Sequence, residues 1–372
     1  AGWRVRTDRG SGRSRPVTET GSLPTVDVSN IETVSSLPRI VSTTFGASVK
    51  SVFTAQLEGG VGDVLALENE NAQLDHVKEI NEELLAGSAY LTSAGSTTAF
   101  TVPAAIAKHF KIGDAVGQYD VSATGHDRTS GSAVSAVNTS TGVVTIASGT
   151  TFADGDVAYI YNRAGMTSID DIAAEDGSAV GGGEARSRAY DLTLAGRTAG
   201  GWNAAASASY NSGTGRALSL TLLDTAIQKI RENGGEPKLI LLGHDQYFNL
   251  ERLLNSNQRY LGQEEYQVGV GSERTYPGTR TGLVLATYQG IPILPDADVP
   301  KSVSTADAVL GSNVYVLDTD YLEIAVAQPT QYVENRDYFA ANALVVRGLL
   351  YTMAEMRCKN IFVQSKIADL NS

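Results

Sequence analysis

The chain has 372 residues, of which 42% are hydrophobic and 19% charged, and its formal net charge is −12. This length exceeds what one hydrophobic core usually supports, so two or three packed regions are expected. The acidic balance argues against a general nucleic-acid binder, no apolar run approaches the roughly 18 residues of a membrane span, and the single Cys358 excludes an intrachain disulfide framework.

Positive charge gathers at the N-terminus, in residues 1 to 16. Five arginines stand there against Asp8 alone, a net charge of +4 that leaves −16 for the rest of the chain: Arg4, Arg6, Arg9, Arg13 and Arg15. This segment lacks core-forming residues, and the Ser-, Thr-, Gly- and Pro-rich stretch that follows, to residue 38, has no helical or strand period. Two interpretations are equally open: a basic arm that contacts a neighbouring copy or DNA, and a solvated tail.

Two elements are predicted before residue 90. Residues 39 to 56 contain β-forming pairs on either side of Gly46, a pattern that predicts two extended strands. Residues 64 to 86 follow the spacing of an amphipathic helix. Its apolar stripe is expected to be buried as core: Leu67, Leu74, Val77, Ile80 and Leu84.

Residues 93 to 162 differ from both flanks, because Thr, Ser, Gly, Ala and Val dominate them. A Phe-x-x-Gly-Asp pattern occurs there twice, 42 positions apart, and a tyrosine follows each copy at the same offset. A repeated turn that feeds a strand predicts a small β-barrel or sandwich module with Phe110 and Phe152 in its core. Tandem binding repeats are the alternative.

The second half alternates helices and strands. Residues 218 to 233 predict a helix that ends at the glycines that follow it. A buried strand at 238 to 242 and a second helix at 245 to 255 come next, and the remainder is rich in strands. The fold class is therefore α+β with a β insertion.

No convergent catalytic set is recognisable. The histidines stand in unrelated contexts without the spacing of a zinc site: His76, His109, His126 and His244. His244-Asp245 follows a predicted strand and is the most enzyme-like position, although Asp245 is better explained as a helix cap. Asp-x-Asp patterns begin at Asp296 and Asp318 and suggest Mg²⁺ or Ca²⁺ ligands, but Asp is common in turns for its backbone hydrogen bonds. No catalytic residue, cofactor or metal is therefore expected.

Six motifs follow one another along the second half of the chain: Gly200-Gly201-Trp202, Leu218-Ser219-Leu220, Pro237 to Leu254, Tyr288 to Ile293, Val314 to Asp318 and the strands of residues 337 to 368. In this order they resemble the major capsid proteins of tailed double-stranded DNA viruses, which have the Hong Kong 97 fold.

The resemblance implies a succession of seven regions. These are an N-terminal arm at 1–28, an extended β loop at 29–60, a spine helix of the peripheral domain at 61–92, an inserted β-barrel-like module at 93–162, a connection at 163–182, an axial domain at 183–315 and a peripheral return at 316–372. The module departs from the minimal pattern of the family. It is expected on the outer face, since the interior must hold DNA.

The resemblance also implies a structural protein rather than an enzyme. Copies of the chain are expected to form the hexamers and pentamers of an icosahedral shell that encloses double-stranded DNA without sequence specificity. Scaffolding, portal and decoration proteins are further expected partners. No membrane is expected as a partner. The expected location is the virion capsid, assembled in the host cytoplasm, since the N-terminus lacks the apolar core of a secretory signal. The alternatives are another virion or surface-layer structural protein and a hydrolytic or carbohydrate-active enzyme that uses His244.

Overall fold

The computed structural model describes most of the chain. The described residues are 2–6, 21, 31–55, 64–87, 89–119, 128–147, 151–173, 188–189, 192–193, 214–257, 287–303, 309–335 and 344–372. Arg9, Arg13, Arg15 and His126 lie outside them, as does the Gly200-Gly201-Trp202 motif. Among the described helices, none is long and apolar enough to cross a membrane.

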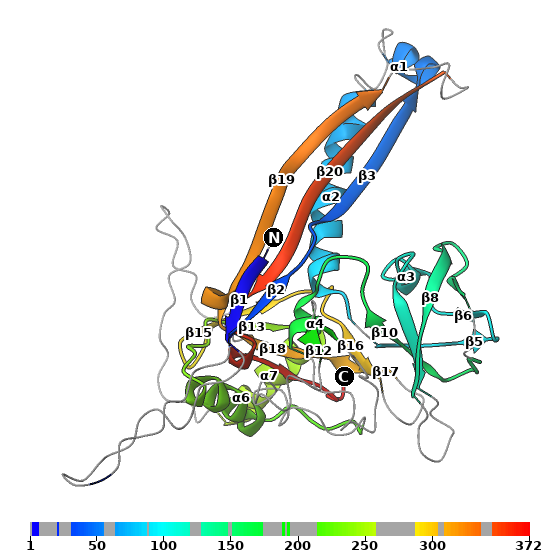
Figure 1. Ribbon diagram of the computed structural model, residues 1–372. Helices are drawn as coiled ribbons and strands as arrows, with labels where there is room; N and C mark the ends of the chain where they lie inside the picture. Colours follow the sequence, from blue (N-terminus) through cyan, green and yellow to red (C-terminus); the bar gives the residue numbers. More distant parts are fainter. Residues whose placement is uncertain are drawn as a thin grey trace, which may run out of the picture.

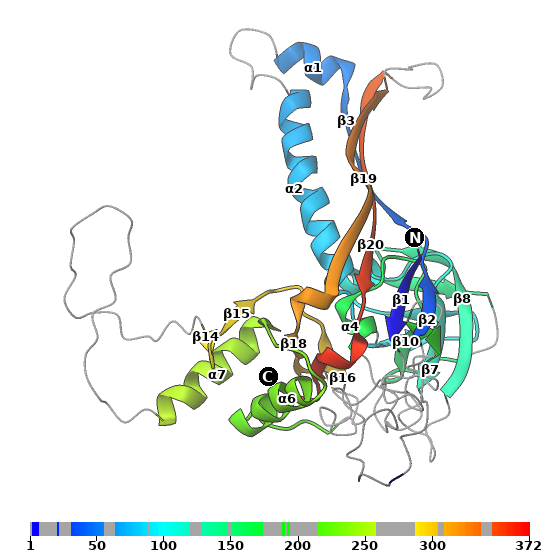
Figure 2. The same ribbon diagram turned by 60° about the vertical axis from the view of Figure 1, so that its left-hand side comes forward.

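A long arm rises from the body of the molecule and consists of one helix against one sheet (Figure 1). Strands β3 (Arg39–Ser48), β20 (Val345–Cys358) and β19 (Leu322–Asn335) are antiparallel, in the order β19-β20-β3. Helix α2 (Val64–Leu85) lies along this sheet, and α1 (Val49–Ala55) sits at the tip (Figure 2). Alternate side chains of β20 are buried, as the two-residue period of a strand requires: Val346, Leu350, Thr352 and Ala354.

The two-stranded excursion predicted for residues 39 to 56 is wrong. β3 runs straight through Gly46 and pairs along its whole length with β20, near the C-terminus. A Cβ at Gly46 would lie 3.1 Å from the Val346 carbonyl oxygen, so glycine eases close strand pairing there and makes no turn. Residues 49–55 are helical, and the Ser48 hydroxyl accepts a hydrogen bond from the Ser51 amide at the start of this helix.

The first residues are anchored to the body. β1 (Gly2–Arg6) pairs antiparallel with β2 (Ile31–Ser35), so the predicted arm and loop share one two-stranded sheet. Trp3 is buried, and its indole N–H donates a hydrogen bond to the carbonyl oxygen of Cys358 at 2.9 Å. Its ring joins a hydrophobic cluster with Met356. The prediction that this segment lacks core-forming residues is therefore wrong at Trp3.

A seven-stranded antiparallel sheet follows α2, in the order β4-β10-β7-β8-β9-β6-β5. Its elements are β4 (Ala89–Leu91), β5 (Ala94–Gly95), β6 (Ala99–Thr101), α3 (Ala104–Ala107), β7 (Ala115–Tyr119), β8 (Arg128–Asn138), β9 (Val143–Ile146) and β10 (Val157–Asn162). Phe110 and Phe152 are each 2% exposed and belong to one hydrophobic cluster of this sheet. The ring of Phe100 lies between them, with centroid distances of 5.3 and 4.6 Å respectively.

The two Phe-x-x-Gly-Asp turns have the same local structure. Each aspartate carboxylate accepts a hydrogen bond from the amide three residues before it, at 2.7 Å for Asp114 and 2.6 Å for Asp156. The glycines before them have positive φ, 97° at Gly113 and 87° at Gly155. Glycine adopts this conformation without strain, and so both copies of the motif turn the chain in the same way.

The strands after these turns pair with each other. In the antiparallel register of β7 and β10, Tyr159 faces Gly117, and these two residues hold equivalent positions in the two repeats. A Cβ at Gly117 would lie 2.2 Å from the ring of Tyr159, so the glycine leaves the space that the buried ring fills. The repeat therefore forms a local pseudo-two-fold arrangement between β7 and β10.

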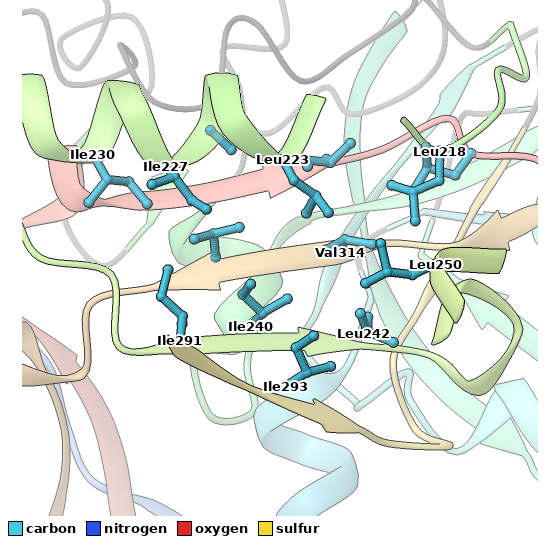
Figure 3. Packing of buried hydrophobic residues seen from close by; sticks show 14 of the residues in the cluster. Leu218, Leu223, Ile227, Ile230, Ile240, Leu242, Leu250, Ile291, Ile293 and Val314 are labelled. Atoms are coloured by element: carbon cyan, nitrogen blue, oxygen red, sulfur yellow. The ribbon is translucent and has the colours of Figure 1, made fainter. Parts of the chain in front are cut away.

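The body contains a five-stranded sheet in the order β14-β15-β13-β18-β21, in which only β13 and β15 are parallel. Its strands are β13 (Leu239–Leu242), β14 (Thr287–Tyr288), β15 (Ile291–Pro295), β18 (Val314–Leu317) and β21 (Gln364–Ile367). Helix α6 (Leu220–Glu232) begins after Ser219, whose hydroxyl accepts from the Leu222 amide. Its buried face packs on the sheet (Figure 3): Leu223, Ala226, Ile227 and Ile230. The helix predicted at 218–233 is therefore confirmed, as are its partners β13 and α7 (His244–Asn257).

The C-terminal segment returns to the body sheet. β18 crosses the predicted division between residues 315 and 316, and β21 lies beside it. The remaining short elements are α4 (Ile169–Ile172), β11 (Arg188–Ala189), β12 (Leu192–Thr193), β16 (Lys301–Val303), β17 (Val309–Ser312), η1 (Thr319–Tyr321) and η2 (Ile361–Val363). A sequence division at residue 315 therefore cuts through one sheet.

Candidate assembly surface

The apolar stripe of α2 faces mostly away from the sheet. Leu67 is 48% exposed, and Leu74 and Val77 are each 67% exposed, so the prediction that these three side chains are core is wrong for the isolated chain. Ile80 and Leu84 are half-buried and pack against a small cluster of the arm. The helix instead turns its Ala72 and His76 face inward, on the opposite side.

His76 fastens α2 to the sheet, a role that the sequence pattern did not reveal. Its ring nitrogens lie 3.0 Å from the Thr43 hydroxyl of β3 and 2.7 Å from the Thr352 hydroxyl of β20. The Thr352 hydroxyl lies 2.8 Å from that of Thr330 on β19, so one polar chain crosses all three strands. Burial lowers the pKa of His76. The small Ala72, one turn earlier, is also buried and lets the helix lie close to the strands.

The sheet also presents apolar side chains to solvent. Besides those of α2 and Phe53 of α1, the exposed large hydrophobic residues of the arm lie on the sheet: Ile40, Ile324, Val326, Tyr332 and Val333. β19 is an edge strand, and its pairing with β20 shifts register on both sides of Gln328, next to Pro329. Such irregularities interrupt the row of free backbone groups that an edge offers to another strand. The arm is thus two layers thick and exposes apolar side chains on the outer side of α2 and on the sheet.

Ion pairs join the seven-stranded sheet to α2. Lys111 lies 2.5 Å from Glu83 and 3.4 Å from Glu79, and Lys108 pairs with Glu82. Burial alone would lower the pKa of Lys111, but the carboxylates of Glu83 and Glu79 outweigh burial and raise this pKa. The charges therefore fix the β sheet to the base of the arm.

His109 gives this junction a dependence on pH. Its ring stacks on Tyr90, and burial together with the nearby Lys108 lowers its pKa from 6.5 to about 4. Between pH 6.5 and 4 the unfolded chain therefore binds a proton that the folded chain does not. Stability should fall through this window by at most about 1.4 kcal/mol per pH unit and level off below it.

Chemical denaturation at pH 7 and pH 5 measures this loss. The variant His109→Phe keeps the aromatic stack but cannot be protonated, so its loss should be smaller than that of the unchanged protein by roughly 2 kcal/mol. Equal losses in both proteins would show that other groups cause the effect.

A buried ion pair holds the body together. Lys366 of β21 is 0% exposed at its side chain and lies 2.7 Å from Asp170 of α4. The Tyr315 hydroxyl of β18 donates to the same carboxylate at 2.6 Å. The sequence did not indicate the pair of Lys366 and Asp170, because an isolated lysine within a short strand normally predicts an exposed side chain.

The three aspartates singled out in the sequence each accept a backbone hydrogen bond. Asp245 accepts from the Ser312 amide at 2.8 Å, which helps to lower its pKa against the opposing effect of burial. It lies in the first turn of α7. Asp296 and Asp318 each accept from the amide two residues later, as turn residues do. Among the described residues no three His, Cys, Asp or Glu side chains are grouped to hold a metal.

The exposure of Leu74 changes what its substitution should do. Because Leu74→Asp places the charge in water, the variant should fold with an unchanged denaturation midpoint and yet assemble poorly, since the new charge would be buried in a contact. The matched variant Ala72→Asp puts a charge under the same helix and should lose the fold. Circular dichroism and particle yield separate the two. A Leu74→Asp protein that fails to fold would contradict the outward placement.

Several solved structures are similar to this chain. The cyanophage A-1(L) capsid asymmetric unit aligns at 12% identity and a TM-score of 0.56, over 100% of this chain and 88% of that chain. A Gordonia phage Cozz structure aligns at 11% identity and a TM-score of 0.46, over 100% and 81%. The SrpI encapsulin complex of Synechococcus elongatus PCC 7942 aligns at 10% identity and a TM-score of 0.42, over 100% and 82%. A search of curated proteins gives no match.

A family model described as the SU10 major capsid protein matches residues 12–344, which is nearly the whole chain. The likeness to the cyanophage capsid shows that the fold is that of tailed-phage shells, of the Hong Kong 97 type. The arm, with its helix on a long sheet, and the separate body sheet correspond to the α+β class expected from the sequence. The chain belongs to the SU10 major capsid protein family and is a major capsid protein of a phage shell.

Proposed function

We propose that copies of this chain form hexamers and pentamers of a closed icosahedral shell around double-stranded DNA, without a catalytic role. The observation that carries the proposal is the two-layered arm, because apolar side chains lie exposed on α2 and on the sheet, where neighbouring copies can cover them. Symmetric repetition supplies such neighbours at every position. The acidic body suits a container whose wall does not bind its cargo tightly.

Further parts of the proposal follow from the family resemblance. Scaffolding, portal and decoration proteins are proposed partners, and assembly is proposed to take place in the host cytoplasm. The division into seven regions remains part of the proposal, and residues 93–162 are proposed to form a module on the outer face of the shell. The strand pairing supports insertion, because β4, just before the proposed start, pairs with β10, which reaches the proposed end, so the chain enters and leaves the module side by side.

Negative-stain electron microscopy of concentrated purified protein tests the shell. Closed particles, or capsomers with six-fold and five-fold symmetry, are the expected result. Flat two-dimensional lattices would favour a surface-layer protein instead. A protein that stays monomeric at every concentration, checked by light scattering, would overturn the proposal.

The basic segment is proposed to act between chains, and its charge can be tested without removing Trp3. Replacing all five arginines of residues 4 to 15 with serine should lower the yield of particles and weaken the dependence of assembly on salt. Replacing them with lysine keeps the charge and should preserve most of the yield. If the serine variant assembles like the unchanged protein at every salt concentration, the segment has no such role.

A further inference from the structure

We propose that acid releases the seven-stranded sheet from α2 and lets the sheet turn as one unit about its two connections to the base of the arm. The contact that opens is the ionic latch, which consists of six residues: Glu79, Glu82 and Glu83 of α2, and Lys108, His109 and Lys111 just after α3. The inference goes beyond the proposed function, because it concerns the single chain and does not require a shell.

The two connections lie together beside the base of the arm (Figure 1). The chain enters the sheet through β4, soon after α2 ends, and leaves it through β10, and these two strands are antiparallel neighbours. Connections that lie side by side hold a folded unit at one place and leave its far parts to other contacts. The ionic latch supplies such a contact on the α3 side of the sheet.

Arg163 fastens the connections. Its side chain is 5% exposed and lies 2.9 Å from the Asp171 carboxylate of α4. Its guanidinium also donates a hydrogen bond to the Gly87 carbonyl oxygen at 2.7 Å, beyond the end of α2. A carbonyl acceptor does not titrate and arginine keeps its charge, so acid leaves this second bond intact.

The charges of the ionic latch are divided by sign. The carboxylates belong to α2 and the lysines to the sheet: Lys108 pairs with Glu82, and Lys111 lies 2.5 Å from Glu83 and 3.4 Å from Glu79. The side chains of Glu82 and Glu83 are only 7% and 8% exposed, so solvent ions screen these pairs weakly. Acid removes the negative charges alone, because lysine stays protonated. The attraction between helix and sheet is therefore lost.

His109 adds a positive charge to the sheet in acid. Burial of its ring against Tyr90, together with the nearby Lys108, lowers its pKa to about 4 while the latch is closed. Once the latch opens, water reaches the ring and the pKa returns toward 6.5. Between pH 6.5 and 4 the open form therefore binds a proton that the closed form does not, and opening becomes more favourable as the pH falls.

The other charged groups near His109 do not oppose this change. Lys78 lies 3.8 Å from Glu82 on the helix side, and Arg163 adds positive charge beside the ring. Asp114 is buried, which raises its pKa, so it takes up its proton at a higher pH than an exposed aspartate does. After the carboxylates are protonated, cations face each other across the contact.

Resonance energy transfer between two dyes measures the opening in the unassembled protein. Ile112→Cys beside the ionic latch and Asp75→Cys on the exposed side of α2 carry the dyes, while the native Cys358 is buried and unreactive. The transfer efficiency should fall in one step as the pH is lowered from 7 to 4. Hydrogen-exchange protection of the β7 and β10 pairs and of α6 should stay unchanged through this step.

Three variants assign the step to the ionic latch. Glu82→Gln combined with Glu83→Gln imitates the protonated carboxylates and should move the midpoint to higher pH. His109→Phe keeps the aromatic stack and should move the midpoint to lower pH, with an uptake of about one proton fewer per chain. Glu70→Gln, on the exposed side of the same helix, is the control and should leave the midpoint unchanged.

Two results would overturn the inference. One is a transfer efficiency that stays constant until α6 loses its protection. The other is a loss of β7 and β10 protection in the same step, because acid would then unfold the sheet instead of releasing it. Neither result depends on particle formation, so a protein that forms no shell fails the proposed function alone.

Discussion

Replacing Lys366 with methionine should destabilise the fold by about 3–5 kcal/mol, the cost of leaving one member of a buried ion pair without its partner. The side chain of Lys366 has no exposure, and that of Asp170 has 2%. The methionine fills a similar volume, so the loss arises from charge and not from a cavity. Denaturant unfolding followed by tryptophan fluorescence measures the change in free energy.

Two further variants separate charge from position. Lys366→Met combined with Asp170→Asn removes both charges and keeps an acceptor for the Tyr315 hydroxyl, so most of the lost stability should return. Lys359→Met removes a half-exposed lysine that pairs with Glu323 and should leave the midpoint unchanged. A double variant no better than the single one would show that the ammonium group makes other essential contacts.

Replacing Phe152 with alanine should destabilise the seven-stranded sheet by about 3–5 kcal/mol, because a buried aromatic ring is lost and a cavity remains. Phe110→Ala should behave alike, since the two rings share Phe100 as a neighbour. Ile112→Ala in the same turn is the matched control, because Ile112 is 69% exposed and its removal should cost little.

Hydrogen exchange shows where the Phe152→Ala loss falls. If residues 93–162 are a separate module, amide protection should drop in this sheet and stay unchanged in α6 and β13 of the body. An equal drop in both places would mean that the two parts fold as one unit, which would refute the proposed insertion.

The body helices could be predicted because local signals specify them. In residues 218 to 233 the apolar side chains repeat with the helical period, Ser219 caps the start, and Gly234 follows the end with a φ of 80°. Each of these signals lies within a few residues of the element that it defines. The Phe-x-x-Gly-Asp turns are local in the same sense, since a glycine and an aspartate suffice to make them.

The candidate assembly surface could not be predicted in the same way. A helical period shows that Leu67, Leu74 and Val77 share a face, but a face buried in a single chain and a face buried between chains have the same period. The strand that pairs with β3 could not be predicted from the sequence either, because β20 lies near the other end of the chain. Only the arrangement of the sheet shows that Ala72 and His76 point inward.

The register between β7 and β10 gives part of the seven-stranded sheet an internal symmetry. Tyr159 faces Gly117, and a shift of 42 positions carries the pairs on either side, Val116 with Ile160 and Gln118 with Ala158, into each other. One ten-residue unit of turn and strand is therefore complementary to a second copy of itself. Each copy of this unit therefore presents to the other the same backbone hydrogen-bonding edge. The symmetry ends at the side chains of the central pair, because glycine in one strand leaves the space that the tyrosine ring of the other fills.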